Sequence, residues 1–150
     1  LAQATGNYLQ ITGVQLEVGS TATSFEHRSY GEELKLCQRY YYMHANGATS
    51  GSAEDAIGTG TWYNGSEFYT AIHFPTTMRT KPSLDQASGS SYYYQNNAGG
   101  GGGFNDFTAV WTAGLNMVFL SKTGSSGTQG ASAMVRTGST SAKLGFSSEI

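Results

Sequence analysis

The sequence predicts an all-β fold, an antiparallel, jelly-roll-like β-sandwich preceded by one strand and one short helix. The chain has 150 residues, of which 21 are glycine, and aromatic residues make up 13% while charged residues make up 12%. This composition suits short strands joined by small-residue turns better than helices. Stretches that alternate apolar and polar residues also recur between positions 40 and 150, about eight of them, at the spacing expected of a sandwich or jelly roll.

Residues 1–28 are interpreted as a terminal strand and linker from an upstream β module. The stretch YLQITGVQLEV, residues 8–18, alternates in two pieces of opposite parity, and Gly13 separates them. That pattern indicates a strand with a glycine-marked bulge. The turn-rich GSTATS follows. The first residue is not Met, so we expect a C-terminal fragment of a longer chain.

Residues 29–39 are expected to form a short connector helix. Ser29 and Glu32 have the spacing of a capping box. Apolar positions then recur at helical spacing: Tyr30, Leu34, Cys37 and Tyr41. A helix of about three turns is unstable alone and must pack on something. We interpret Cys37, the single cysteine, as a buried and inert side chain rather than a catalytic nucleophile.

Residues 40–150 are expected to form the sandwich. Asn64-Gly65 predicts a type I′ hairpin. Beyond it, one strand face carries Phe68, Thr70, Ile72 and Phe74, and the other carries Glu67, Tyr69, Ala71 and His73. Pro75 and Pro82 bracket an irregular connection into an edge strand.

The rest of this region reads as further strands around one loop. SSYYYQNN is expected to be a tyrosine-rich strand, and AGGGGG a flexible loop. Four more strand candidates are FNDFTAVW, LNMVFLSK, ASAMVRTG and AKLGFSSEI. Gly/Ser turns such as TGSSGTQG separate them.

Charge and spacing argue against several kinds of function. The net charge of −2 gives no broad positive field for nucleic acid, and no apolar run approaches a membrane span. His27, His44 and His73 have no zinc-ligand spacing. No pair of carboxylates is marked for glycoside hydrolysis. We therefore predict no catalytic residue, no metal and no cofactor.

Aromatic residues are the strongest candidates for ligand contact, because sugar rings stack on tyrosine and tryptophan while amides orient sugar hydroxyls. The predicted glycan-binding residues are Trp62, Tyr63, Asn64, Tyr92, Tyr93, Tyr94 and Asn96. Gly99, Gly100, Gly101, Gly102 and Gly103 are predicted to form a tip loop whose bare backbone approaches a ligand. Two alternatives stay open: three consecutive tyrosines face both sides of a strand, so some belong to the core or a subunit contact, and the glycine run is a disordered surface loop.

Three stretches carry a resemblance to a known family. The segment ITGVQLEVGSTATSFEHRSYGEELKLCQRYY resembles one that recurs in tail-fibre and related structural proteins of tailed bacteriophages. FPTTMRTKPSL and LGFSSEI are similar to later pieces of such modules, in the same order. This resemblance covers about a third of the chain. It implies a virion protein, a homotrimeric fibre or spike, in which a linker helix follows a carbohydrate-binding-like sandwich, and it implies no catalytic residues.

Together these features predict the tip module of a phage tail fibre. The module is expected to bind a host-surface glycan or protein without catalysis, to have no nucleic-acid partner and not to insert into membranes. It would be made in the host cytoplasm and act outside the cell as part of the virion. The alternatives are a purely structural or capsid-decorating trimer and, third, a polysaccharide depolymerase.

Overall fold

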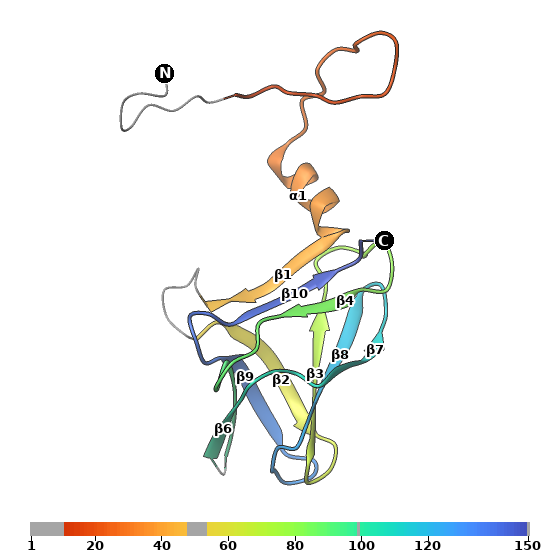
Figure 1. Cartoon of the computed structure of the whole chain (residues 1–150). Coiled ribbons are helices and arrows are strands. Elements are labelled where there is room, and N and C mark those ends of the chain that lie inside the picture. Colours follow the sequence, from red (N-terminus) through yellow and green to blue (C-terminus); the bar gives the residue numbers. More distant parts are fainter. Residues whose placement is uncertain (1–10, 48–53, 99, 150) are drawn as a thin grey trace, which may run out of the picture.

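The computed structural model describes residues 11–47, 54–98 and 100–149. One helix, α1 (Tyr30–Gln38), precedes ten strands in these ranges (Figure 1). The strands are β1 (Tyr41–Asn46), β2 (Ala56–Trp62), β3 (Glu67–His73), β4 (Ser83–Gln86), β5 (Tyr93–Asn97), β6 (Gly100–Phe104), β7 (Ala109–Ala113), β8 (Met117–Thr123), β9 (Ser132–Thr137) and β10 (Lys143–Ser147). None of the helices among the described residues is long and apolar enough to cross a bilayer.

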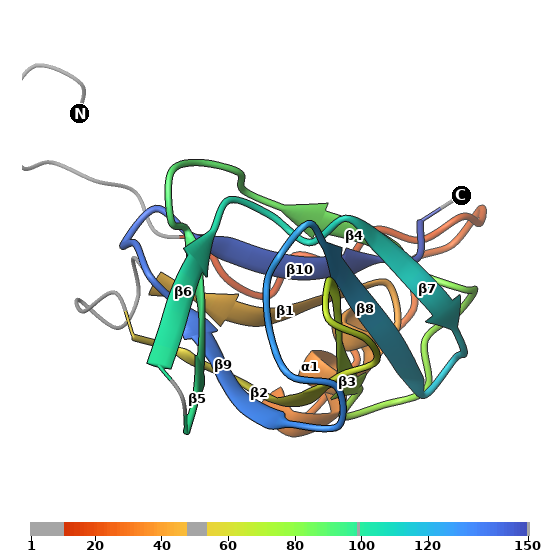
Figure 2. The ribbon, with the colours of Figure 1, turned by 90° about the horizontal axis from the view of Figure 1, so that it is seen from below.

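The strands form two antiparallel sheets, which confirms the predicted all-β, sandwich-like fold. The small sheet has the order β1-β10-β4, and the large one has the order β6-β5-β9-β2-β3-β8-β7. Figure 1 shows the small sheet next to α1, with the large sheet extending away from the helix. Figure 2 views the molecule from the end opposite α1 and shows that the large sheet is strongly curved. This curvature leaves a concave inner face that ends in the loops farthest from α1.

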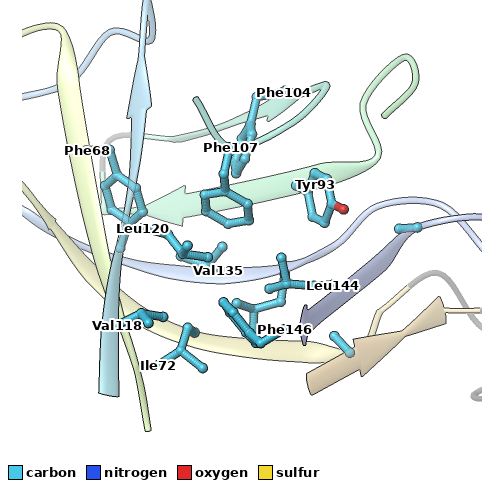
Figure 3. Close-up of a cluster of buried hydrophobic side chains, with 14 of the residues drawn as sticks. Phe68, Ile72, Tyr93, Phe104, Phe107, Val118, Leu120, Val135, Leu144 and Phe146 are labelled. Carbon is cyan, nitrogen blue, oxygen red and sulfur yellow. The ribbon is translucent and has the colours of Figure 1, made fainter. Parts of the chain in front are cut away.

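The core fills the space between the two sheets. Leu144 and Phe146 of β10 are fully buried and point toward Ile72 and Val118 of the large sheet (Figure 3). A second group consists of aromatic rings, with Tyr93 lying 5.6 Å from Phe104 and 5.2 Å from Phe107 between centroids. This aromatic group closes the core under β5 and β6.

The β2–β3 hairpin confirms one prediction and corrects another. Phe68, Thr70 and Ile72 are buried along one face of β3, as their alternation predicts. The turn is not type I′, because β2 ends at Trp62 and β3 begins at Glu67, leaving a four-residue loop in which neither Asn64 nor Gly65 has positive φ. The Asn64 Oδ1 atom holds this loop by accepting from the backbone N–H groups of Ser66 and Glu67, both at 2.8 Å. The side chain of Asn64, rather than left-handed backbone, makes the turn.

The glycine run is a strand and not the flexible loop that the sequence predicted, apart from Gly99, which lies outside the described residues. Gly100–Phe104 pairs antiparallel with all five residues of β5. The β5 side chains occupy the space that side chains on β6 would fill, since a Cβ at Gly103 would lie 2.9 Å from the Tyr94 ring and one at Gly101 would lie 2.5 Å from Asn96 Oδ1. Cross-strand cover of this kind orders glycine in a strand.

The segment before the sandwich differs from its prediction in two ways. Residues 11–18 form no strand, and residues 8–10 of that prediction lie outside the described part. The helix is confirmed, with Ser29 and Glu32 forming both halves of the capping box. Cys37, however, is exposed and not buried, because no residue of α1 is buried within this chain. The described part of the chain therefore leaves the apolar side of the helix partly exposed.

Candidate ligand-binding pocket

The structure separates the predicted glycan-binding aromatic residues into core and surface. Trp62 and Tyr93 are fully buried, so neither ring can stack on a ligand, and the prediction is wrong for both. The Tyr93 hydroxyl donates to the carbonyl oxygens of Ala87 and Lys143 at 2.9 and 2.6 Å. Burial raises the pKa of Tyr93 above its usual value. These two residues are structural.

Tyr63 and Asn64 lie in the β2–β3 loop. Tyr63 is 63% exposed and makes an edge contact with Tyr69, their ring centroids being 5.5 Å apart. Asn64 also donates through Nδ2 to Glu67 at 2.8 Å, in addition to accepting the two backbone bonds of its turn. The Asn64 amide is therefore used within the loop, and the exposed Tyr63 with the half-buried Tyr69 remains as a small aromatic pair.

Tyr94 and Asn96 point to the outer face of β5, opposite to Tyr93. The guanidinium of Arg136 lies over the Tyr94 ring at 4.8 Å from its centroid. Tyr92 is half-buried, and a Cβ at Gly89 would collide with its ring. Asn96 lines a separate shallow depression of about 340 Å³ on the outer face. The structure therefore does not bring the predicted residues together into one site.

Part of the predicted glycine tip does line a pocket. An open cavity of about 560 Å³ lies between the β5–β6 hairpin and the β8–β9 connection, lined by Gln95, residues 101–106, Lys122 and residues 124–126. We call it the hairpin pocket. Figure 1 places β6 and the β8–β9 connection in the half of the molecule far from α1, and Figure 2 shows them from that end. Its volume is within the usual range of small-ligand sites, about 300–1,000 Å³.

One residue that lines the hairpin pocket, Gln95, carries a buried polar atom without a partner. Gln95 follows Tyr93 on the inner face of β5 and is 7% exposed. Its Oε1 atom is buried and has no hydrogen-bond partner. Leaving a buried acceptor unpaired costs about 1–3 kcal/mol. Native structures keep few such atoms, and one on a side chain that lines a pocket points to a ligand donor as its missing partner.

An ion pair forms the opposite wall of the pocket. Lys122 Nζ lies 3.4 Å from Asp106 Oδ1, and the Lys122 side chain is 18% exposed. The Ser88 hydroxyl donates to the other carboxylate oxygen of Asp106 at 2.8 Å. Lys122 Nζ also lies 5.8 Å from the centroid of the Phe104 ring. The wall thus presents one positive and one negative group that neutralise each other.

The glycines make the third wall. β6 is an edge strand of the large sheet, so one side of its backbone has no neighbour among the described strands. An edge strand presents unpaired N–H and C=O groups, and glycine adds no side chain to cover them. A ligand in the hairpin pocket can therefore reach backbone donors and acceptors as well as side chains.

A second polar cluster lies on the small sheet, outside this pocket. Asp85 Oδ2 accepts from the Tyr41 hydroxyl at 2.9 Å and lies 2.6 Å from Lys143 Nζ. The hydrogen bond from Lys143 lowers the pKa of Asp85, while burial and the bond to Asp85 raise the pKa of Tyr41. No group of three or more His, Cys, Asp or Glu in the described ranges could hold a metal ion.

The site predicted from the sequence did not include the side chains that line the hairpin pocket. These are Gln95, Asn105, Asp106, Lys122, Ser125 and Ser126. One signal was available. Gln95 has the same parity as Tyr93 in a strand, and an amide at a core-facing position requires a partner. The pairing of Lys122 with Asp106, sixteen residues apart, follows from the tertiary fold.

Comparisons with protein-family models, curated proteins and solved structures gave no match to this chain.

Proposed function

We propose that this chain is the tip module of a bacteriophage tail fibre and attaches the virion to a glycan on the host surface. The single observation that carries the binding proposal is the hairpin pocket with its unpartnered Gln95 acceptor. The proposal that the fibre belongs to a phage rests on the resemblance of residues 11–41 and two shorter stretches to tail-fibre segments.

The position of the pocket supports attachment. α1 and the residues before it project from one end of the sandwich, and β6 and the β8–β9 connection lie toward the other (Figure 1). These two segments carry most of the residues that line the hairpin pocket. In a fibre that continues through the N-terminal segment, the pocket would face away from the shaft. A receptor on a cell could then reach it without contacting the rest of the fibre.

The exposed side of α1 supports assembly into a homotrimer. Leu34 and Cys37 lie on the same side of the helix and are exposed, with Leu34 40% exposed. The segment before the helix exposes Val14, Leu16 and Val18 as well. Soluble proteins rarely leave contiguous apolar surface uncovered, and symmetric self-association is the usual way to cover it.

The proposal is tested by adsorption of the fluorescently labelled chain to a panel of bacterial strains. We expect binding to some strains, competition by their isolated surface polysaccharide, and loss of binding after mild periodate treatment of the cells, which cleaves vicinal diols of sugars. Binding that survives periodate and yields to protease would replace the glycan with a protein receptor. Absence of binding to every strain would favour a purely structural module.

A second measurement on the same polysaccharide tests a depolymerase function. Hydrolysis would release reducing ends from polysaccharide incubated with the chain. Among the described residues, Asp106 is the single carboxylate that lines the hairpin pocket, and it is paired with Lys122 rather than with a second acid. We therefore expect binding without release of reducing sugar.

A further inference from the structure

We infer that the hairpin pocket binds a single uncharged sugar unit, and that Gln95 selects it by accepting a hydrogen bond from one of its hydroxyls. This inference rests on the proposed function, since it names the part of a glycan that the pocket takes. It differs from the stacking mode that the sequence suggested, because the recognising groups are polar and the described residues that line the pocket offer no open aromatic face.

The need for a donor follows from the burial of Gln95. Gln95 is 7% exposed and its side chain lines the open cavity, while its Oε1 is enclosed and has no partner. A half-turn of the amide brings Oε1 to the place beside Gly102 that Nε2 occupies in this structure, where a ligand can donate to it. The carbonyl of a side-chain amide is an acceptor only. The group that best complements it is therefore an O–H or N–H, held by a ligand small enough to enter the pocket.

The preference for an uncharged ligand follows from the ion pair. Asp106 and Lys122 lie 3.4 Å apart and contribute opposite charges to the same wall. An anion at this wall would be attracted by Lys122 and repelled by Asp106, and a cation would experience the reverse. Neither gains net attraction. Lys122 also argues against a divalent cation, whose charge it would repel.

The preference for a hydroxyl-rich ligand follows from the mixture of donors and acceptors. Gln95 Oε1 and Asp106 accept, Lys122 donates, and the β6 edge offers both kinds of backbone group. A hydroxyl can donate and accept at once, so several neighbouring hydroxyls on one ring can serve all of them.

Stacking plays no part in this pocket. Phe104, the aromatic residue lining it, is buried, and the ammonium of Lys122 lies over its ring. Recognition must therefore depend on the positions of hydroxyls around the sugar ring. A site built on hydrogen bonds rejects a ligand that lacks one of them, because its own buried group is left unpaired.

The test follows the backbone amides of the native protein by NMR during titration with methyl glycosides of glucose, galactose, mannose and N-acetylglucosamine. Glucuronic acid and glucosamine are the charged comparators. We expect at least one uncharged glycoside to shift the amides of residues 101–106 and 124–126 saturably and more tightly than either charged sugar. Failure of all four, tighter binding of a charged sugar, or shifts centred on Tyr63 and Tyr69 would overturn the inference.

Two variants test the role of Gln95. Gln95→Met keeps the shape of the side chain and removes its acceptor, and we expect affinity to fall about tenfold or more. Gly102→Ala adds a methyl group beside Gln95 and should also weaken binding, since its Cβ would lie 3.3 Å from the Gln95 amide nitrogen. Melting curves confirm that each variant folds. Unchanged affinity in Gln95→Met would remove Gln95 from the site.

Deoxy analogues of the bound glycoside separate recognition from a structural role. One analogue should bind the native chain weakly because it lacks the hydroxyl that donates to Gln95. In Gln95→Met that analogue and the parent sugar should bind equally. If Gln95→Met still discriminates as the native chain does, the selective residue is another one.

Asp85→Asn is the matched control. Asp85, like Asp106, pairs with a lysine and accepts from a hydroxyl, but it lies outside the pocket. Asp106→Asn should weaken sugar binding and Asp85→Asn should not. Binding of a sugar without adsorption to cells would contradict the proposed function but not this inference. Adsorption to cells without shifts of the pocket amides would contradict this inference but not the proposed function.

Discussion

Gln86 in β4 and Gln95 in β5, strands that are consecutive in the chain but belong to different sheets, differ in whether the fold satisfies the side-chain amide. Gln86 donates to the Phe107 carbonyl at 2.8 Å and accepts from the Phe107 N–H at 2.9 Å, so both ends of its amide are used. It thereby holds the β6–β7 connection against β4. The Oε1 of Gln95 has no partner at all.

These glutamines should respond oppositely to substitution. Gln86→Met leaves two backbone groups of the buried Phe107 unpaired, and we expect it to lower the free energy of unfolding by about 1–3 kcal/mol. Gln95→Met removes an unpaired buried acceptor and should leave the free energy of unfolding unchanged or raise it by about 1 kcal/mol. Chemical denaturation of both variants checks this. Equal destabilisation would mean that Gln95 is a structural residue like Gln86.

The Asp85 cluster predicts a dependence of stability on acid. Lys143 and Tyr41 lower the pKa of Asp85 below its ordinary value of 3.8. A carboxyl whose pKa is lower in the folded chain stabilises it above the ordinary value, and this contribution disappears as pH falls through the folded pKa. The stability difference between the native chain and Asp85→Asn should therefore shrink between about pH 5 and pH 2. Melting temperatures across this range test it, and a constant difference would contradict it.

Among the elements, β6 best shows what sequence patterns can and cannot predict. The strands β3, β8, β9 and β10 follow from alternation, because each places apolar residues on one buried face. A run of glycine has no alternation to read, and its pairing depends on Tyr94 and Asn96 in the neighbouring strand. The helix cap is local and was predictable, whereas the exposure of Cys37 depends on what covers α1. Pocket residues such as Lys122 and Asp106 meet through the fold and carry no local signal.

The glycines of β6 should not tolerate alanine equally. A Cβ at Gly101 would lie 2.9 Å from the Gln95 backbone oxygen and 2.5 Å from Asn96, so we expect Gly101→Ala to destabilise by about 1–3 kcal/mol. At Gly102 the nearest atom is the flexible end of Gln95, at 3.3 Å. Gly102→Ala should therefore change stability by less than about 1 kcal/mol. Thermal melting compares the two, and equal losses would show that β6 needs glycine for its backbone alone.

In the molecule as a whole, α1 lies outside the sandwich, and none of its side chains is buried by it. Leu34 lies on the same side of the helix as Tyr30 and Cys37, and Leu36 lies on a different side. The two leucines are almost equally exposed in the single chain, at 40% and 41%. They form a matched pair for testing which side of the helix meets other copies.

Sedimentation velocity of Leu34→Glu and Leu36→Glu tests the proposed trimer. We expect the native chain and Leu36→Glu to sediment as trimers, and Leu34→Glu to dissociate, because a charge would be buried without a partner. A monomeric native chain at micromolar concentration would contradict the trimer. Dissociation by Leu36→Glu instead would place the contact on the other side of the helix.

Under the proposed attachment function, the construction of the hairpin pocket has a consequence for how the choice of receptor can change. One wall belongs to a core strand, whereas Ser125 and Ser126 belong to a connection and take no part in the core. The next residue, Gly127, must remain glycine, because any Cβ there would overlap the Trp62 ring. Diversification of positions 125 and 126 should therefore alter which surface the module adheres to while the sandwich stays intact. In a phage that attaches as proposed, a library restricted to these two positions would be a direct route to redirected host range.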